Sequence, residues 1–330
     1  MCSYWVFFLS MKALPNITAQ IDEKIIYKVI DRNFSLLAPY FYSFISNWLV
    51  RAYERYNDID KFLIVIYLIH KNLVFYRKNG LIINYDTFYK DRTLEINKIN
   101  ISDISKDLEI PKESVRRKIL DLEKNGAIKK IGKKIFVDRS TFHKARATDT
   151  ISELSALLSE FNKILKKEKL ISEIFELNKI TNSIKENFSF CLYQLNKFIF
   201  IYLNRWRAEL GDLETFSVGM ILVLSATHNK DFIPSKSSLN AYRKEIMGSD
   251  LRGVNAMSIS EITNIPRPTV VRKLKFLIDK KFLYINDKKL ISLNVKDSSF
   301  NKFKNLQNKN LLSLSNFTIR LFNQIKVTNS

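Results

Sequence analysis

The sequence predicts a mainly α-helical protein with small β-hairpins, built from two tandem copies of one structural unit. Only seven glycines occur among 330 residues, and long stretches with helical apolar periodicity lie between the helix breakers. Residues 48–70 and 101–104 recur 158 positions later, so that Trp48 matches Trp206. Residues 110–115 recur 155 positions later. Between these two matched stretches, the second copy is therefore expected to be three residues shorter than the first.

The repeat divides the chain into two halves, each large enough to bury a core. We expect a first unit over residues 17–168 and a second over residues 169–330. Residues 1–16 are expected to precede the repeats, and Met11 is a candidate for the true start of the protein. The apolar run near the start is too short to cross a bilayer, so no membrane segment is expected.

The first unit is expected to open with helices. Residues 17–30 have the periodicity of an amphipathic helix, and Pro39 suits the first turn of a second helix that runs to about residue 56. Asp60 is the expected N-cap of a buried helix that ends at about residue 70. Residues 71–99 are expected to be irregular apart from a turn and one short aromatic helix.

A helix-turn-helix followed by a β-hairpin is predicted next. Ser102 is expected to cap the first helix, Pro111 to open the second, and Gly126 to end it in the left-handed conformation. The apolar residues of the second helix recur at helical spacing on one face: Val115, Ile119 and Leu122. Residues 128–131 and 134–137 are expected to form the strands of the hairpin.

The second copy repeats these parts. We expect a long helix over residues 188–210, a buried helix over residues 217–228, a helix-turn-helix over residues 260–280 and a hairpin over residues 283–291. The inward stripe of its second helix is Val270, Leu274 and Leu277. Each copy is also expected to end in a closing helix. Either each closing helix packs on its own unit, or the two pack on each other and clamp the repeats together.

The order of helices, helix-turn-helix, hairpin and closing helix resembles the MarR-type winged-helix regulators. Residues 101–128 carry the resemblance in the first copy and residues 259–274 in the second. The resemblance implies a symmetric dimer with interlocked terminal helices, here fused into one chain as a pseudo-dimer. The chain departs from the family pattern in two places. Some 25–30 residues precede each helix-turn-helix where the family has a short link, and the second turn is three residues short.

In a winged helix the second helix of the motif enters the major groove, where base edges can be distinguished. The residues beside the inward stripe would face the DNA. In the first copy they are Lys112, Glu113, Ser114, Arg116 and Arg117. In the second copy they are Arg267, Thr269, Val271, Arg272 and Lys273. The hairpins offer lysines that suit phosphate contacts: Lys133 and Lys134, and Lys288 and Lys289.

The formal net charge of +21 favours a polyanionic partner. The same richness in Lys, Ile, Asn, Phe and Tyr is what an AT-rich genome produces, so the charge alone does not decide. Basic residues lie at matching positions of both copies, and this recurrence favours DNA as the partner. The sequence therefore predicts a sequence-specific regulator of transcription that binds double-stranded DNA. Because its two DNA-contacting helices differ, we expect an asymmetric target site.

No catalytic or cofactor motif accompanies this pattern. The sequence has no Gly-rich phosphate loop, zinc-ligand spacing or nucleophile elbow, so we expect no enzyme, no metal and no cofactor. His70 and His228 match at the ends of the two buried helices, where a cation is favourable without any chemistry. Two cysteines cannot form a disulfide framework, which favours a reducing cytoplasm. As a DNA-binding protein, the chain is expected to be associated with the nucleoid.

Two other functions remain open. Plasmid and phage replication initiators also pair two winged-helix domains in one chain, and repeated sites beside an origin would favour that role. A winged helix can also serve as a protein-interaction scaffold. Whether two chains assemble into a homodimer is also open.

Overall fold

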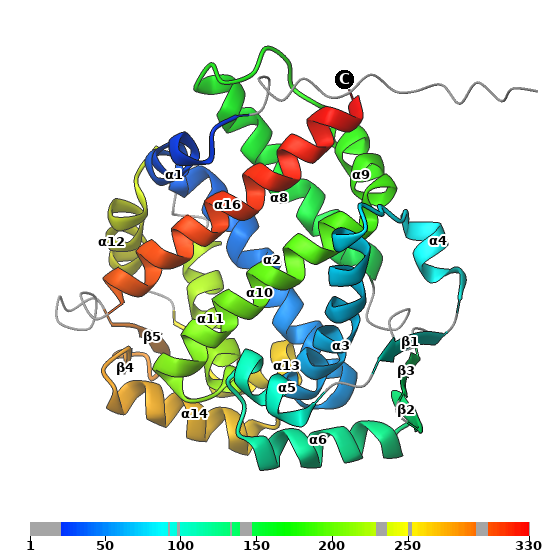
Figure 1. Ribbon diagram of the computed structural model, residues 1–330. Helices are drawn as coiled ribbons and strands as arrows, with labels where there is room; N and C mark the ends of the chain where they lie inside the picture. Colours follow the sequence, from blue (N-terminus) through cyan, green and yellow to red (C-terminus); the bar gives the residue numbers. More distant parts are fainter. Residues whose placement is uncertain are drawn as a thin grey trace, which may run out of the picture.

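Helices make up most of the described part of the protein, where two small antiparallel sheets lie at the periphery (Figure 1). The computed structural model describes residues 21–91, 93–97, 100–132, 134–138, 147–228, 236–249, 253–294 and 303–329. The predicted class, mainly α with small β-hairpins, is confirmed.

Among the residues that the structure describes, four helices open each repeat. In the first repeat they are α1 (Glu23–Arg32), α2 (Phe34–Tyr56), α3 (Ile59–Lys78) and α4 (Tyr85–Lys90). In the second repeat they are α9 (Leu177–Glu186), α10 (Phe188–Leu210), α11 (Leu213–Thr227) and α12 (Leu239–Ser249).

A pair of helices, a hairpin and a closing helix complete each repeat. The first repeat has β1 (Thr93–Asn97), α5 (Ile101–Leu108), α6 (Lys112–Lys124), β2 (Ile128–Ile131), β3 (Lys134–Asp138) and α8 (Ala147–Lys167). The second has α13 (Ala256–Thr263), α14 (Arg267–Asp279), β4 (Leu283–Ile285), β5 (Ile291–Leu293) and α16 (Lys304–Asn329).

The spacing between the repeats is nearly constant, and the predicted offset of 158 is wrong. Asp58 caps α3 and Asp212 caps α11, 154 positions apart. Asn100 and Asn255 cap α5 and α13, 155 positions apart. The true spacing is thus about one helical turn shorter. A shift of one turn keeps the apolar face in phase, so matching residue types alone did not reveal the error.

The second turn is therefore not three residues short. Glu109 ends α5 and Asn264 ends α13, both in the left-handed conformation, and α6 and α14 each start three residues later. The short second turn, one of the two departures from the winged-helix pattern, thus disappears. The long segment before each helix-turn-helix remains, and it contains α4 in the first repeat and α12 in the second.

Three predicted helix starts in the first repeat also change. The N-cap of α3 is Asp58, not Asp60, because the Asp58 side chain accepts a hydrogen bond from Lys61 N (3.1 Å). The N-cap of α5 is Asn100, not Ser102, whose own N–H donates to the Asn100 side chain (3.1 Å). Pro39 lies inside α2 rather than in its first turn, because α2 starts directly after α1 without a helix breaker.

The region predicted to be irregular is partly ordered. Helix α3 continues to Lys78, and β1 pairs antiparallel with β3, which also pairs with β2. The second sheet repeats this arrangement in reduced form. Its β4 and β5 form a hairpin, and Val254 adds a single antiparallel bridge to Ile291.

The two repeats share one hydrophobic core in the described residues, although the sequence suggested two units. Helix α3 packs on α10 of the other repeat, and α11 packs on α2 in the equivalent way. The Phe41 ring of α2 lies edge-on to the Tyr202 ring of α10, with centroids 5.7 Å apart. Asp60 of α3 accepts a hydrogen bond from Arg207 of α10 at 2.6 Å.

The end helices of the repeats are exchanged. Helix α1 packs on α16, the closing helix of the second repeat, and α9 packs on α8, the closing helix of the first. The Arg320 guanidinium of α16 binds Glu23 of α1 at 2.8 Å. Each closing helix also packs on the long helix of its own repeat, and the two touch where the Phe161 and Phe322 rings meet at 5.8 Å. Each closing helix thus packs on its own repeat and also contacts the other closing helix, so the two arrangements that the sequence left open occur together.

Within the described ranges, no single helix combines the length and the hydropathy that a membrane crossing needs. Only α10 and α11 taken together reach that threshold, and they meet at an angle of 98°.

Candidate nucleic-acid interface

Helices α6 and α14 lie nearly end to end along one edge of the molecule, at the bottom of Figure 1. The sheet of the first repeat lies beyond the outer end of α6, and the sheet of the second repeat lies on the opposite side. The two hairpins therefore flank the two helices.

The same side-chain interaction holds the turn in front of each helix. The Ser105 hydroxyl of α5 donates to the Ile110 carbonyl at 2.7 Å, and the Ser260 hydroxyl of α13 donates to the Ile265 carbonyl at 2.7 Å. The proline that follows in each copy occupies the N-cap position of α6 or α14. Identical residue types at equivalent positions thus set the angle at which each helix leaves its turn.

The predicted inward stripes are confirmed. Val115, Ile119 and Leu122 are buried in α6, and Val270, Leu274 and Leu277 are buried in α14. Gly126 follows α6 with φ of +71°, as the left-handed C-terminal position requires. The opposite face of each helix is consequently turned toward solvent.

The first exposed face is basic with one acidic residue. Lys112, Glu113, Arg116 and Arg117 are exposed, and Ser114 is partly buried. Arg116 lies 3.7 Å from Glu113, one turn away on the same surface. Such an exposed pair contributes little to stability and can open when a ligand arrives.

The second exposed face keeps most, but not all, of the predicted residues. Arg267, Val271 and Arg272 are exposed, and Thr269 is partly buried. The prediction that Lys273 faces the DNA is wrong, because its ammonium is paired with the carboxylate of Asp212, the N-cap of α11. The equivalent Lys118 makes the equivalent pair with Asp58. These lysines anchor α14 and α6 to the core, so Lys273 does not belong to the candidate interface.

The sequence prediction did not include one exposed residue of α6 and the equivalent exposed residue of α14. Leu120 and Lys275 occupy equivalent places, one turn beyond Arg116 and Val271, and both are exposed. The helical period of 3.6 residues would have included them had the prediction continued past the first two turns. The second copy thereby gains a cation where the first presents an apolar side chain.

The hairpin lysines differ between the copies. Lys134 begins β3 and is half-exposed, with its ammonium 2.5 Å from Glu95 of β1. Lys133 lies outside the described residues. Lys288 and Lys289 are exposed in the turn before β5, since that strand starts only at Ile291. The Asn286 side chain holds this turn by accepting hydrogen bonds from Lys288 N and Leu290 N.

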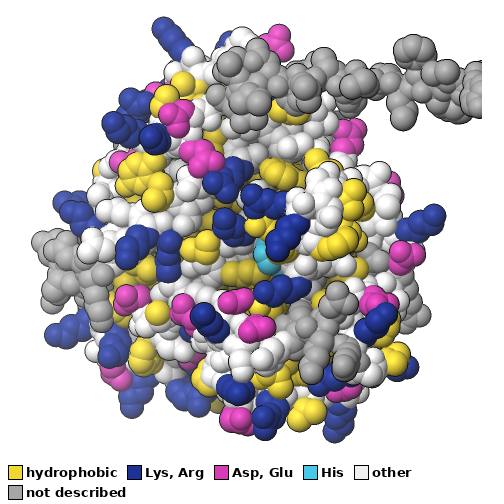
Figure 2. Space-filling view, viewed as in Figure 1, with side chains coloured by type: hydrophobic (Ala, Val, Ile, Leu, Met, Phe, Trp, Pro, Cys, Tyr) yellow, Lys and Arg dark blue, Asp and Glu magenta, His cyan; other side chains and the backbone are white. Residues whose placement is uncertain are grey.

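Figure 2 shows Lys and Arg side chains along this edge, interspersed with apolar and a few acidic ones. The edge has neither a continuous positive surface nor an acidic one. A surface of this kind offers separate cations for phosphates and leaves uncharged positions between them.

The two histidines do not occupy equivalent positions, contrary to prediction. His70 lies inside α3 and stacks on Tyr193 of α10, with ring centroids 4.9 Å apart. Burial, together with two neighbouring lysines, lowers the pKa of His70 to about 4. His228 is exposed at the C-cap of α11. Among the described residues, no group of three or more His, Cys, Asp or Glu could hold a metal ion.

Comparisons of the chain with protein-family models, with curated proteins and with solved structures found no match.

Proposed function

We propose that the chain is a sequence-specific double-stranded DNA-binding protein that regulates transcription. In this proposal α5–α6 with its hairpin and α13–α14 with its hairpin are two winged helix-turn-helix units. Helices α6 and α14 enter the major groove, and the hairpin lysines contact phosphates. The supporting observation is that two equivalent helices, each with a basic exposed face, lie on one edge of an interlocked pseudo-dimer.

The cations of these faces suit both tasks of a DNA interface. An Arg can form two hydrogen bonds to guanine in the major groove, and a Lys or Arg at a phosphate releases bound counterions. Arg117 and Arg272 are equivalent and exposed in both copies, and neither forms an ion pair within the described part of the chain. We therefore assign these two arginines as the shared contacts.

The two helices would not select the same bases. Arg116 corresponds to Val271, which suits the methyl group of thymine rather than guanine. Glu113 corresponds to Pro268, so the only acidic residue predicted to face the DNA lies in the first copy. The proposal accordingly includes an asymmetric target rather than an inverted repeat.

The test begins with selection of bound fragments from random DNA, followed by a titration of affinity against salt. A winged-helix protein of this charge should lose affinity steeply as salt rises, with a slope of about −0.9 for each phosphate contact. The double variant Arg117→Ala and Arg272→Ala should lower specific affinity by about 1–3 kcal/mol for each base that an arginine binds. The matched control removes two exposed cations from α9 at the far side, Lys179→Ala and Lys185→Ala.

The control should bind DNA as the unmodified chain does, apart from a small effect of net charge. If both double variants bind equally well, α6 and α14 are not the DNA-contacting helices. If the preferred site is a perfect inverted repeat, the asymmetric target is wrong. Repeated sites beside a replication origin would instead identify a replication initiator.

One observation favours a protein partner as the second candidate. Several large apolar side chains are exposed on these helices: Leu120 of α6, Met257 and Ile262 of α13, and Val271 of α14. A protein-interaction scaffold would use them together. Binding of such a partner should depend weakly on salt, whereas DNA binding depends on it steeply, so the salt titration separates the two functions.

A further inference from the structure

The two hairpins leave an apolar side chain exposed at the same place. In each hairpin the first residue of the first strand is buried, Ile128 in β2 and Leu283 in β4. The last residue of each of these strands is an isoleucine, and Ile131 is 54% exposed and Ile285 is 59% exposed. Single exposed apolar residues are ordinary on protein surfaces. An isoleucine that recurs at the end of both hairpins adds little to the stability of the free chain, because apolar side chains stabilise a fold by being buried.

The duplication does not by itself explain this recurrence. The spacing of 155 that relates Ile128 to Leu283 relates Ile131 to Asn286. In this alignment β4 ends one residue earlier than β2, and its last residue is again an isoleucine. The tip of the hairpin, rather than one inherited position, thus keeps the exposed isoleucine.

Exposed lysines lie beside each isoleucine. Two of them form exposed ion pairs: Lys130 lies 3.6 Å from Glu123, and Lys134 lies 2.5 Å from Glu95. Such pairs are weak and can open when a phosphate is near. In the sequence, Asp287 is the only acidic residue between the paired strands of the two hairpins. The exposed lysines beside the two isoleucines are Lys129, Lys130, Lys134, Lys288 and Lys289. An apolar side chain flanked by cations suits a DNA groove, which has phosphates at its edges and stacked bases between them.

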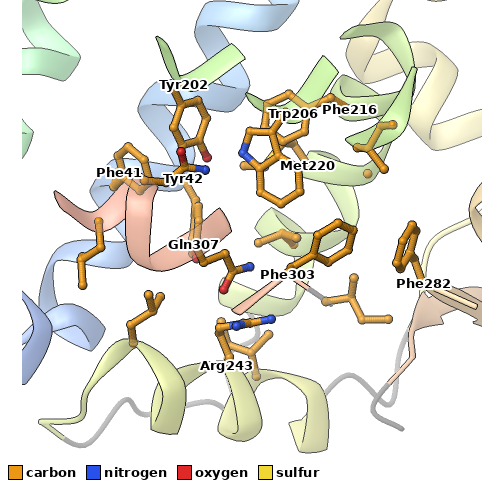
Figure 3. A pocket seen from close by; sticks show the side chains of 18 of the residues that line it. Phe41, Tyr42, Tyr202, Trp206, Phe216, Met220, Arg243, Phe282, Phe303 and Gln307 are labelled. Carbon is orange, nitrogen blue, oxygen red and sulfur yellow. The ribbon is translucent and has the colours of Figure 1, made fainter. Parts of the chain in front are cut away.

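The tips of the hairpins are held in place. At the base of the second hairpin, Phe282 packs on Phe303 with ring centroids 4.5 Å apart, and both rings line the cavity shown in Figure 3. At its tip, the Asn286 side chain accepts hydrogen bonds from Lys288 N (3.1 Å) and Leu290 N (2.9 Å). In the first hairpin, β3 lies between β2 and β1 and pairs with both. A tip with a fixed conformation loses little conformational entropy when it enters a ligand.

We propose that Ile131 and Ile285 are apolar wedges that enter the minor groove of the bound duplex and kink it. This inference rests on the proposed function and adds to it a deformation of the DNA. Proteins that bind the minor groove insert apolar side chains, isoleucine among them, between base steps and kink the duplex by about 20–90°. Each wedge partly unstacks one base step, and the neighbouring lysines contact the phosphates on either side.

The position of the hairpins places the two kinks. Helices α6 and α14 lie nearly end to end, and the hairpins flank them (Figure 1). The wedges therefore act outside the bases that the helices contact, one at each end of the target. Pyrimidine–purine steps such as TA and CA are the most easily kinked. The target accordingly carries such a step at each end, selected without any hydrogen bond to its bases.

The experiment uses the full chain and the DNA fragment that it selects. Energy transfer between dyes at the two ends of the fragment measures the bend, and 2-aminopurine placed at either outer step becomes brighter when that step unstacks. We expect a bend and a rise in fluorescence at both steps. Ile131→Ser with Ile285→Ser should remove at least about half of the bend and the fluorescence rise at saturating protein. Ile131→Met with Ile285→Met, which keeps two apolar wedges, should preserve both signals.

Each single serine variant should lose the fluorescence rise at its own end only, and it keeps the other wedge if the double variant binds too weakly. The matched control replaces two equally exposed isoleucines, Ile25→Ser in α1 and Ile174→Ser just before α9. Both helices lie away from α6 and α14 in Figure 1. This control should bend the DNA as the unmodified chain does, and thermal unfolding checks that every variant is folded.

The wedges are wrong if the unmodified chain binds the fragment without bending it. They are also wrong if the folded serine variants bend it as strongly as the unmodified chain, or if the control loses the bend to the same extent. In each of these cases DNA binding is still observed, so the proposed function stands. If the chain binds no duplex at all, the proposed function is wrong and the wedges are wrong with it.

Discussion

Replacing Lys273 with Met separates the two roles that its position in α14 allows. The Lys273 ammonium pairs with Asp212, which also caps α11 by accepting from Thr215 N at 2.7 Å. Met keeps most of the aliphatic length and removes the charge. If Lys273 anchors α14 to the core, the variant should lose stability and keep its intrinsic affinity for DNA.

The exposed fractions of the two side chains set the size of the effect. Removing one partner of a fully buried pair costs about 3–5 kcal/mol, and an exposed pair is worth at most about 1 kcal/mol. The Lys273 side chain is 15% exposed, but that of Asp212 is 37% exposed, so water screens the charge left behind. We expect a loss of about 1–2 kcal/mol in the free energy of unfolding, and a Tm lower by about 1.5–3 °C.

The pH dependence provides a second check. Burial favours a higher pKa for Asp212, but hydrogen bonds from Lys273 and Thr215 outweigh burial and hold the pKa below its usual 3.8. A carboxylate with a lowered pKa in the folded state stabilises the fold above its unfolded pKa and loses that contribution as the pH falls through the folded value. The difference between the two proteins should therefore shrink below about pH 4.

Thermal unfolding and DNA affinity are measured on the same samples, with Lys275→Met as the matched control. Lys275 lies two residues further along α14 and is exposed on the face that we assign to DNA. The control should keep its Tm and lower the salt slope by about 1. The reasoning is refuted if Lys273→Met leaves the Tm unchanged and weakens DNA binding while Lys275→Met does not.

Three further changes test the core and the second hairpin. Arg207→Met removes the 2.6 Å partner that Asp60 has in the other repeat, while Lys118 stays 3.7 Å from Asp60, so the change should cost about 2 kcal/mol in urea unfolding; a loss below 1 kcal/mol would contradict a shared core. His70 stays neutral when folded, with a pKa of about 4 against an ordinary 6.5, so the unfolded state binds more protons between these values. Stability should fall on the order of 3 kcal/mol from pH 7 to pH 4, and His70→Gln should abolish that part. Gly253→Ala should destabilise the second hairpin by more than about 1 kcal/mol, seen as faster hydrogen exchange there, because φ is +65° and the new Cβ would lie 2.7 Å from Leu290 Cβ; unchanged exchange would contradict this.

Local spacing explains what the sequence alone could predict. The stripe of Val115, Ile119 and Leu122 follows from the helical period, and Gly126 marks the end of α6 by its freedom at positive φ. The hairpins follow from short apolar runs around a turn. Each of these features is decided within about a dozen neighbouring residues.

Interactions between distant residues explain the errors. Lys273 lies at the border of the inward stripe, and only its partner Asp212, 61 positions earlier, decides which way it turns. The repeat offset failed by one helical turn because chance matches of Trp and His outweighed the capping residues, which show the true spacing only in three dimensions. Residues far apart in the sequence, such as Arg243 and Gln307, line one cavity of the second repeat, and no local pattern in the sequence predicts this.

The duplication makes each repeat a control for the other. The pairs Lys118–Asp58 and Lys273–Asp212 recur because each repeat must anchor the same helix to the same core, and the hydroxyl hydrogen bonds of Ser105 and Ser260 recur for the same reason. The copies differ on the exposed faces of α6 and α14, where Arg116 corresponds to Val271 and Leu120 to Lys275. Differences on these faces are what separate DNA contacts of the two copies would require.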